Sequence, residues 1–344
     1  MIKAGVVGLG KMGKAHLNWI MNSPDMQLVA LCEKNNERAK MLSEEYSVDV
    51  FANVDEFLLS NEMDMVVIVT TNEAHEFITI KALDAGKDAI VEKPMSITYE
   101  STKKMIAAAE KNRKKIFVHQ SSRWDRDYNL VKETIESGRI GKLLSIKSSV
   151  MLFDEGWPSW GIDGMANPWR IKLAYGGGML LDWGAHLVDQ YIQLFGKHPK
   201  GVYGKLQNGI WSQEVDDAFI AMLDFNDSIQ CEIECSNNAG IPLPRWYVVG
   251  TNGTLMIKGK AEPFWGDAIL KYKDSTNNVR IENIEMLGIK ESGMEGGFYT
   301  DLARYVKGEL DCFVDMYDAS EVVKTLEMIR MSSKEGRYVE WNEL

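Results

Sequence analysis

The opening residues constrain the fold more than any other stretch of the chain. Residues 2–7 are mostly apolar, as in a strand that is buried on both faces. They lead directly into Gly8-Leu9-Gly10-Lys11-Met12-Gly13, which matches the pattern G-x-G-x-x-G, and a helix is expected over residues 12–21. Gly8 permits a tight turn, Gly10 lets the backbone approach a pyrophosphate, and Gly13 lets the helix pack closely on the strand.

The spacing after this turn fits a dinucleotide site. The N–H groups at the helix start, at Lys11 and Met12, would face the phosphates. A second apolar run, residues 28–32, ends on Glu33, about twenty residues after Gly13 as the dinucleotide pattern expects. A carboxylate there can bind both ribose hydroxyls and would repel a 2′-phosphate, which favours NAD. Two alternatives stay open: Glu33 is a solvated strand end, or Lys34 pairs with the 2′-phosphate of NADP.

The first part of the chain alternates strand and helix patterns about six times. We therefore expect an α/β domain over residues 1–121 with an open, doubly wound parallel sheet, a Rossmann domain. Ligands bind such sheets at the carboxyl ends of the strands. The residues expected to face the cofactor at these ends are Thr70, Asn72, His75, Glu92, Lys93 and Gln120.

Lys93 has two interpretations. It follows Glu92 at a strand end and precedes Pro94, which cannot continue a strand ladder. A lysine at the edge of a cleft can donate a hydrogen bond to a substrate oxygen. The spacing alone favours an ordinary surface lysine in a turn.

Residues 122–344 predict a second, α+β domain. Six strand patterns between residues 202 and 272 follow one another without helices, which favours a large antiparallel sheet. One face of this sheet would be open to a partner subunit. The C-terminal helix is expected to be able to pack back on the first domain.

An irregular stretch, residues 153–175, carries tryptophans among polar groups: Trp157, Trp160, Trp169 and Arg170. Indole faces pack against the C–H face of a sugar ring while polar groups bind its hydroxyls, so these residues and Arg123 are candidate substrate contacts. The alternative is a loop whose tryptophans fill a core or a subunit interface.

Three glycines precede an expected helix over residues 179–195. Asp182, His186, Asp189 and Gln193 fall on one stripe of this otherwise apolar helix. Asp182, one turn from His186, could raise the pKa of the imidazole and orient it as a general base. A solvated face and a zinc site are the alternatives. No further histidine or cysteine cluster supports zinc, so we expect no metal.

Composition excludes several classes of protein. The 344 residues carry a net charge of −11, which argues against binding to nucleic acid or to an anionic membrane. No signal peptide and no apolar run of about 18 residues is recognisable, so we expect a cytoplasmic protein without membrane contact. The four cysteines show no C-x-x-C spacing and are expected to be reduced.

Taken together, these motifs resemble the Gfo/Idh/MocA family, named for glucose–fructose oxidoreductase and inositol dehydrogenase, over essentially the full length. The matching segments are 5–13, 70–75, 92–94, 169–170, 176–189 and 250–255. The resemblance implies a nicotinamide domain, a substrate domain with an open sheet, a dimer or tetramer, and Lys93, Asp182 and His186 as catalytic residues. Thr71 departs from the family, which often has proline at that place.

The resulting expectation is hydride transfer between NAD, with NADP possible, and a secondary hydroxyl or keto carbon of a sugar, glycoside or cyclitol. Two alternatives are kept. One is an NAD-dependent glycosidase that oxidises its substrate transiently at C3 and eliminates the aglycone. The other is a non-enzymatic protein that senses nicotinamide cofactors.

Overall fold

The computed structural model describes residues 1–344 except 61, 154–167, 226–227, 260–264, 287–296 and 312. Its first sheet has six strands in the order β3-β2-β1-β4-β5-β6, all parallel. The strand order reverses at β1, which is the topology of a doubly wound sheet, so the predicted α/β class is confirmed. The strands are β1 (Ile2–Val7), β2 (Met26–Cys32), β3 (Asp49–Phe51), β4 (Met65–Ile68), β5 (Asp88–Glu92) and β6 (Ile116–His119).

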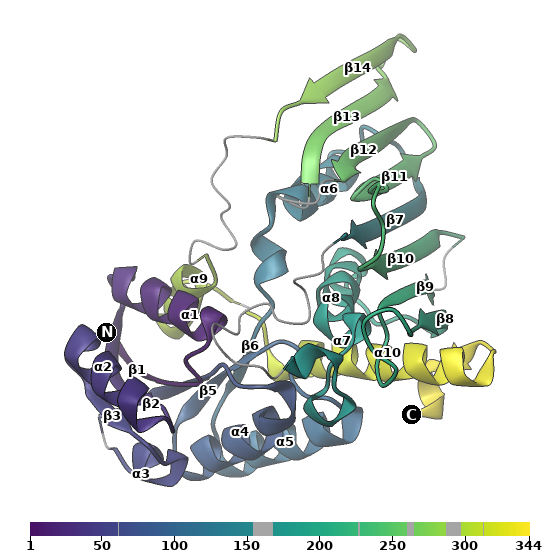
Figure 1. Ribbon diagram of the computed structural model, residues 1–344. Coiled ribbons are helices and arrows are strands. Elements are labelled where there is room, and N and C mark those ends of the chain that lie inside the picture. Colours follow the sequence, from purple (N-terminus) through teal and green to yellow (C-terminus); the bar gives the residue numbers. More distant parts are fainter. Residues whose placement is uncertain (61, 154–167, 226–227, 260–264, 287–296, 312) are drawn as a thin grey trace.

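Helices cover both faces of this sheet. In Figure 1, α1 and α9 lie together above the sheet, and α4 and α5 lie below it. Strands β4, β5 and β6 are almost wholly buried, as their apolar runs predicted, whereas β1, β2 and the edge strand β3 carry exposed residues. The helices are α1 (Lys11–Asn22), α2 (Asn36–Tyr46), α3 (Val54–Leu58), η1 (Asn72–Ala74), α4 (His75–Asp84), α5 (Tyr99–Asn112) and η2 (Ser121–Trp124).

The second sheet has nine strands in the order β14-β13-β12-β11-β7-β10-β9-β8-β15. It is mixed, not antiparallel as predicted, because β10 pairs with β7 in parallel. The long connection between these two strands contains helices and a hairpin, and it returns the chain to the same end of the sheet. The strands are β7 (Leu143–Met151), β8 (Gly201–Gln207), β9 (Ala218–Asp224), β10 (Gln230–Ser236), β11 (Trp246–Gly250), β12 (Gly253–Gly259), β13 (Trp265–Lys273), β14 (Val279–Ile284) and β15 (Val339–Glu340).

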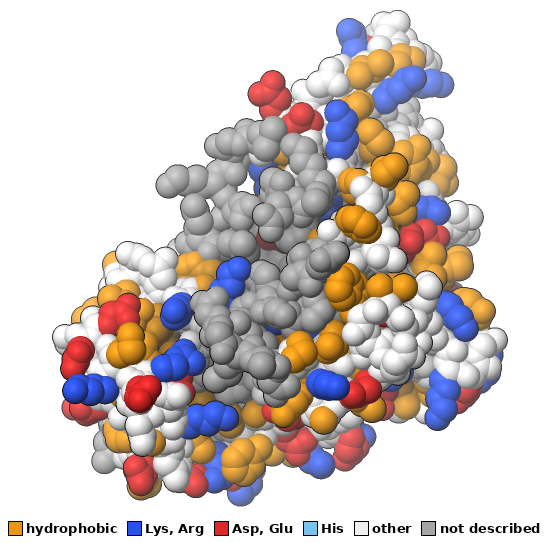
Figure 2. Space-filling model, in the orientation of Figure 1, with side chains coloured by type: hydrophobic (Ala, Val, Ile, Leu, Met, Phe, Trp, Pro, Cys, Tyr) orange, Lys and Arg blue, Asp and Glu red, His pale blue; other side chains and the backbone are white. Residues whose placement is uncertain are grey.

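The two faces of the second sheet differ. Residues alternate between buried and exposed along β9 and β10, as in a sheet with one covered face. Helices α8 (Gly184–Phe195) and α10 (Met316–Glu335) contact its strands on the covered side, and α6 (Arg126–Glu136) packs on β11 and β12. Outward-pointing apolar side chains include Tyr203, Ile220, Met222 and Tyr247. Figure 2 shows hydrophobic side chains along this sheet, interspersed with charged ones.

The helix predicted over residues 179–195 is two helices. A short α7 (Met179–Asp182) ends at Trp183, and α8 begins at Gly184. The carbonyl of Trp183 accepts hydrogen bonds from the N–H groups of both His186 and Leu187, so the turn tightens at this point. Asp182 and His186 consequently lie on either side of the junction.

The end of the chain joins both sheets. Phe298, Tyr299 and Leu302 of α9 (Phe298–Val306) are buried in the core of the first sheet, together with Val314 and with Val323 of α10. α10 also contacts α5 of the first half, and α8 and β8 of the second. The final strand β15, which the sequence did not predict, pairs with β8 and is followed by η7 (Trp341–Glu343). None of the helices among the described residues has the length and apolar character that a membrane-spanning segment needs.

Candidate active site

The glycine turn is built for close approach of the backbone. Gly8 has a φ of +91°, and a Cβ placed there would lie 2.3 Å from the carbonyl oxygen of Val69. A Cβ on Gly13 would lie 2.1 Å from the oxygen of Gly8. Gly10 is the N-cap of α1, and no side chain caps the helix. The first N–H groups of α1, including those of Lys11 and Met12, therefore point out of the turn as a site for a phosphate.

Glu33 follows β2 in nearly full burial, with 8% of its surface exposed. Its Oε1 accepts the N–H of Asn35 at 2.9 Å, and its Oε2 lies 3.5 Å from Arg38. Arg38 also donates to the carbonyl of Leu9 in the glycine turn, at 2.6 Å. This arginine, which joins the carboxylate to the turn, was not among the residues predicted from the sequence. The turn, where Gly8 and Gly13 leave no room for a Cβ, fits the pyrophosphate of a dinucleotide, and the carboxylate of Glu33 fits its ribose.

The side chains predicted at the ends of β4 and β6 are mostly engaged with the protein itself. Asn72 donates to the carbonyl of Gly176, at 2.8 Å, and so joins the two halves of the chain. His75 is fully buried, with Nδ1 3.0 Å from the carbonyl oxygen of Pro94, and Thr70 donates to the carbonyl of Thr71. Among the side chains predicted to face the cofactor, two have a buried atom without a hydrogen-bond partner in the described part of the chain: Nε2 of His75 and Oε1 of Gln120. They are the polar atoms here that a ligand could satisfy.

Lys93 and Asp182 meet although 89 residues separate them. The ammonium of Lys93 donates to Oδ1 of Asp182 at 2.7 Å and to its backbone carbonyl at 2.8 Å. Both side chains are mostly buried, with 16% and 20% of their surfaces exposed. Nε of Arg170 lies 3.5 Å from the other carboxylate oxygen, and its guanidinium stacks over Trp169. The carboxylate is thus shared between two cations at the edge of the first sheet.

His186 has a different partner from the one predicted. Its Nδ1 forms a hydrogen bond of 2.7 Å with the hydroxyl of Ser122, so the expectation that Asp182 orients the ring is wrong. Burial, and after it the positive charge of Lys93, hold the pKa of His186 well below its usual value. Asp182 acts in the opposite direction, but more weakly. The imidazole is therefore neutral near pH 7, as a general base must be.

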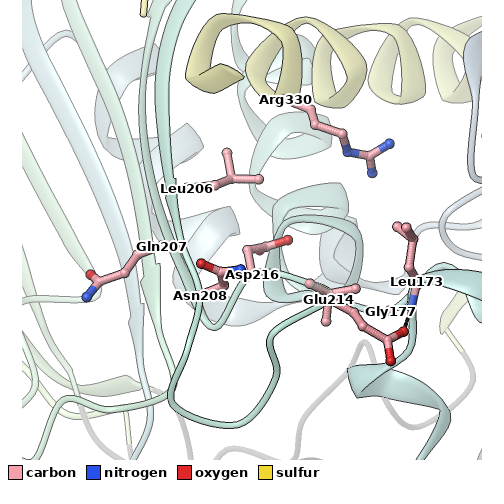
Figure 3. A pocket seen from close by; sticks show the side chains of 9 residues that line it. Leu173, Gly177, Leu206, Gln207, Asn208, Glu214, Asp216 and Arg330 are labelled. Carbon is pink, nitrogen blue, oxygen red and sulfur yellow. Dashed lines mark hydrogen bonds between the residues drawn. The ribbon is translucent and has the colours of Figure 1, made fainter. Parts of the chain in front are cut away.

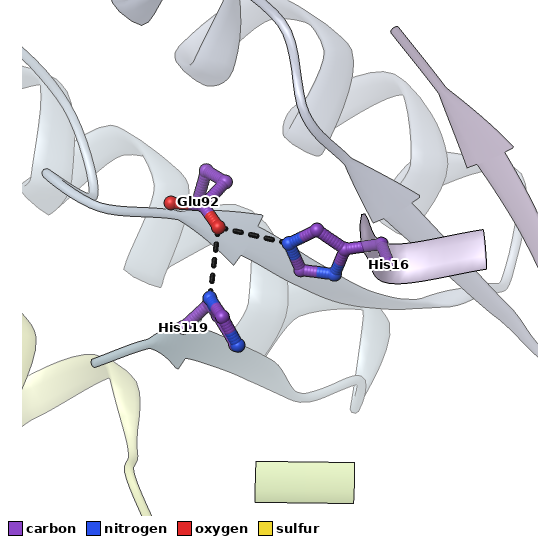
Figure 4. A group of neighbouring side chains, drawn as sticks. All are labelled: His16, Glu92 and His119. Atoms are coloured by element: carbon purple, nitrogen blue, oxygen red, sulfur yellow. Dashed lines mark hydrogen bonds and ion pairs between the residues drawn. The ribbon is translucent and has the colours of Figure 1, made fainter. Parts of the chain in front are cut away.

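Glu92, the last residue of β5, is held by two buried histidines, and its predicted place facing the cofactor stays a prediction. Its Oε1 accepts from Nε2 of His16 and from Nδ1 of His119, each at 2.8 Å, as Figure 4 shows, and all three side chains are buried. Oε2 accepts the backbone N–H of Lys93 at 3.0 Å, and Nδ1 of His16 hydrogen-bonds with Tyr299. Burial opposes ionisation of Glu92, yet the two histidines hold its pKa well below the usual value.

This cluster has the composition of a metal site, which the sequence analysis did not find. One ligand atom from each of His16, Glu92 and His119 lies within 4.8 Å of the others. The two histidines already donate to the carboxylate, so the hydrogen bonds satisfy these atoms without an ion. That we expect no metal stays a prediction.

The last two residues of the polar stripe predicted on residues 179–195, Asp189 and Gln193, bind other side chains of the protein. Asp189 is buried and accepts two hydrogen bonds from Arg123, at 2.8 and 2.7 Å. Arg123, a predicted substrate contact, is thereby committed to this carboxylate, because a buried charge needs an opposite one. Gln193 donates to Asp318. Trp157 and Trp160 lie outside the described residues.

A separate cavity of about 260 Å³ adjoins the start of α7. In Figure 3, Arg330 projects from α10 on one side and Glu214 lies on the other. The cavity is lined by residues that include none of the predicted catalytic side chains.

Comparison with protein families assigns both halves of the chain. A model described as "Oxidoreductase family, NAD-binding Rossmann fold" matches residues 2–120, and the "GFO/IDH/MocA C-terminal domain" matches residues 128–256. The chain belongs to the Gfo/Idh/MocA family of oxidoreductases. The predicted resemblance and the predicted NAD cofactor are thereby confirmed, and the glycine turn with Glu33 supplies the matching geometry in this member of the family.

Individual relatives extend the comparison. The chain is 31% identical over 230 residues to an "Uncharacterized oxidoreductase C115.03" of Schizosaccharomyces pombe, a match that covers 65% of this chain and 60% of that protein. It is 30% identical over 149 residues to the "Inositol 2-dehydrogenase" of Salmonella typhimurium, covering 42% and 44% of the two chains. Thus the chain matches less than two thirds of either protein. The solved structure of an "NAD-binding protein" from Listeria innocua is 26% identical and superimposes with a TM-score of 0.83 over 100% of this chain and 98% of that one.

Proposed function

We propose that this Gfo/Idh/MocA protein is a dehydrogenase that acts on a secondary hydroxyl of a sugar, glycoside or cyclitol. The observation that carries the proposal is the ion pair of Lys93 and Asp182, with His186 four residues after Asp182, in the first turn of α8. It lies where β5 of the NAD-binding domain ends. The similarity to an inositol 2-dehydrogenase supports a polyhydroxylated substrate.

In the proposed mechanism, His186 exchanges the hydroxyl proton of the substrate and Lys93 stabilises the negative charge that develops on the reacting oxygen. NAD, when bound, supplies the acceptor for a hydride from the carbinol carbon. His186 takes the hydroxyl proton at Nε2 during oxidation and returns it during reduction. Lys93 donates a hydrogen bond to the reacting oxygen and stabilises its developing negative charge. Asp182 accepts from Lys93 and so fixes the direction of the ammonium.

Several further assignments belong to the same proposal. Glu33 favours NAD over NADP because its carboxylate would repel a 2′-phosphate. Arg170 and Trp169 contact the substrate, and Trp157 and Trp160 are proposed with them from the sequence. The open face of the second sheet forms a homo-oligomer, because its exposed apolar side chains gain from burial. The domain boundary is proposed at residue 121.

The test is a substrate screen followed by two variants. The protein is mixed with NAD or NADP and a panel of inositols, aldoses, sugar acids and aryl glycosides, and reduced nicotinamide is followed by absorbance. With the best substrate, Lys93→Met and His186→Gln should each lower kcat by about 10²- to 10⁴-fold. NAD binding, measured by calorimetry, should be retained. Lys104→Met, on the exposed surface of α5, is the matched control and should keep full activity.

The remaining outcomes separate the alternatives. Release of the aglycone from an aryl glycoside without net NADH would identify the glycosidase. Tight binding of NADH without turnover of any compound would favour a sensor. Full activity of His186→Gln would contradict the proposed base.

A further inference from the structure

The hydroxyl of Ser122 and the imidazole of His186 connect two elements that are distant in sequence. Ser122 lies in η2, directly after the first sheet, and His186 lies in the first turn of α8. Their contact, Oγ to Nδ1, is 2.7 Å long, and Ser122 has only 6% of its surface exposed. In the part of the chain that the structure describes, Nε2 of His186 has no hydrogen-bond partner. The ring is thus held from one side, and its other nitrogen is available.

The backbone around Ser122 is fixed independently of that contact. Its carbonyl accepts from Nε2 of Gln190 at 3.1 Å, and Gln190 lies one turn after His186 on α8. Oε1 of Gln190 in turn accepts from Arg245 at 3.1 Å, and Arg245 pairs with the buried Asp127 at 3.0 Å. The neighbouring Arg123 is bound twice by Asp189 of the same helix. Because these bonds hold η2 against α8, the serine hydroxyl has a defined position.

The chemistry of the hydroxyl determines what this position does. A neutral imidazole carries one N–H, on either Nδ1 or Nε2, and a partner on one nitrogen selects the tautomer. If Nδ1–H donates to Ser122, the lone pair remains on Nε2 and can take up a proton. When Nε2 returns that proton, Nδ1–H is unchanged. The hydrogen bond from Nδ1–H to Ser122 can therefore be kept during both oxidation and reduction of the substrate. A hydroxyl also brings no negative charge, unlike the carboxylate that commonly binds a catalytic histidine.

We propose that Ser122 is a positioning residue that accepts the Nδ1–H of His186 and keeps its Nε2 free to exchange the proton of the substrate. The proposal deepens the proposed function, since it rests on His186 as the base. The low pKa of His186 agrees with it, because a neutral partner leaves the ring neutral at pH 7.

The direct test is the tautomer of His186, read by ¹⁵N NMR of the histidine-labelled protein without substrate. The chain has five histidines, and His186 is assigned by the signals lost in His186→Gln. We expect Nδ1 protonated and Nε2 unprotonated in the wild type, and a mixture of tautomers in Ser122→Ala. Ser121→Ala, on the same turn, is the matched control and should leave the spectrum of His186 unchanged.

Kinetics give the second readout. Loss of one hydrogen bond should lower kcat of Ser122→Ala about tenfold while KM changes less than about twofold, and Ser122→Thr, which keeps the hydroxyl, should recover most of kcat. The limb of the kcat–pH profile that reports the base should move in Ser122→Ala but not in Ser121→Ala. A wild-type ring protonated on Nε2, or identical spectra of wild type and Ser122→Ala, would overturn the proposal. Because NMR needs no substrate, this result is separate from the outcome of the substrate screen.

Discussion

Because of His16, the free energy of unfolding should decrease as the pH falls from 7 to 5. Its side chain has no exposed surface, and burial, followed by the electrostatic interaction with His119, lowers its pKa from 6.5 to about 4. In the unfolded chain the imidazole regains its usual pKa and takes up a proton below pH 6.5. Since the unfolded state then binds more protons than the folded state, the free energy of unfolding decreases as the pH falls from 6.5 towards 4.

The size of the effect follows from the width of this window. When the unfolded state binds one more proton than the folded state, the free energy of unfolding changes by about 1.4 kcal/mol per pH unit. His16 alone should therefore lower the free energy of unfolding by about 2 kcal/mol between pH 7 and pH 5. Glu92 does not contribute there, because its pKa is held well below 4.5 and its stabilisation is lost only at lower pH. His75 and His186, whose pKa values are also lowered by burial, add losses of the same sign.

The assay compares wild type with His16→Gln by urea unfolding at pH 7 and pH 5 and constant ionic strength. Tryptophan fluorescence and far-ultraviolet circular dichroism should report one common transition. The variant will be less stable at pH 7, but its loss between the two pH values should be smaller than that of wild type by about 2 kcal/mol. Thr134→Val, which changes a fully buried side chain without a titratable group, is the control and should lose as much as wild type. Equal losses in wild type and His16→Gln would refute the reasoning.

Three further predictions concern the cofactor and the buried cluster. Gly13→Ala should weaken NAD binding at least about tenfold in calorimetry, because its Cβ would meet the carbonyl of Gly8, whereas Gly240→Ala, whose Cβ meets nothing closer than 3.9 Å, should bind normally. Glu33→Ala should raise the Kd of NAD about tenfold, because hydrogen bonds to a charged group are lost. The ratio of the Kd of NADP to the Kd of NAD should become smaller, and an unchanged ratio would argue against this role of Glu33. Protein dialysed against Zn²⁺ and then against buffer should retain less than about a tenth of an equivalent by elemental analysis. One equivalent that is lost in His119→Gln would establish a metal site instead.

The fold of the first half was accessible from sequence because its signals are local. Continuous apolar runs, the glycine turn and a carboxylate at the right spacing each lie within about 30 residues, the length of one βαβ unit. The direction of β10 was not accessible. Its parallel partner β7 is some 80 residues earlier in the chain, and strand patterns carry no information on which neighbour they choose.

For the site as well, local motifs predicted the residues but not their contacts. Lys93, Asp182 and His186 were selected from motifs, but their hydrogen-bond partners were not. Asp182 was paired with His186 because they are one turn apart, yet the structure pairs it with Lys93, 89 residues away. Ser122 gave no signal, since a serine in a turn is common and its partner is on a distant helix. Local spacing thus identifies the reactive groups, while tertiary contacts decide how they are oriented.

The contribution of α9 and α10 to the core of the first sheet affects how the protein is made. Phe298, Tyr299 and Leu302 emerge from the ribosome about 180 residues after the sixth strand, which at usual translation rates is a delay of roughly 10 to 40 s. During that time the apolar surface that they cover is open to water and to other nascent chains. We expect the emerging first half to bind chaperones, and a fragment that ends near residue 121 to aggregate rather than fold as an independent NAD-binding module.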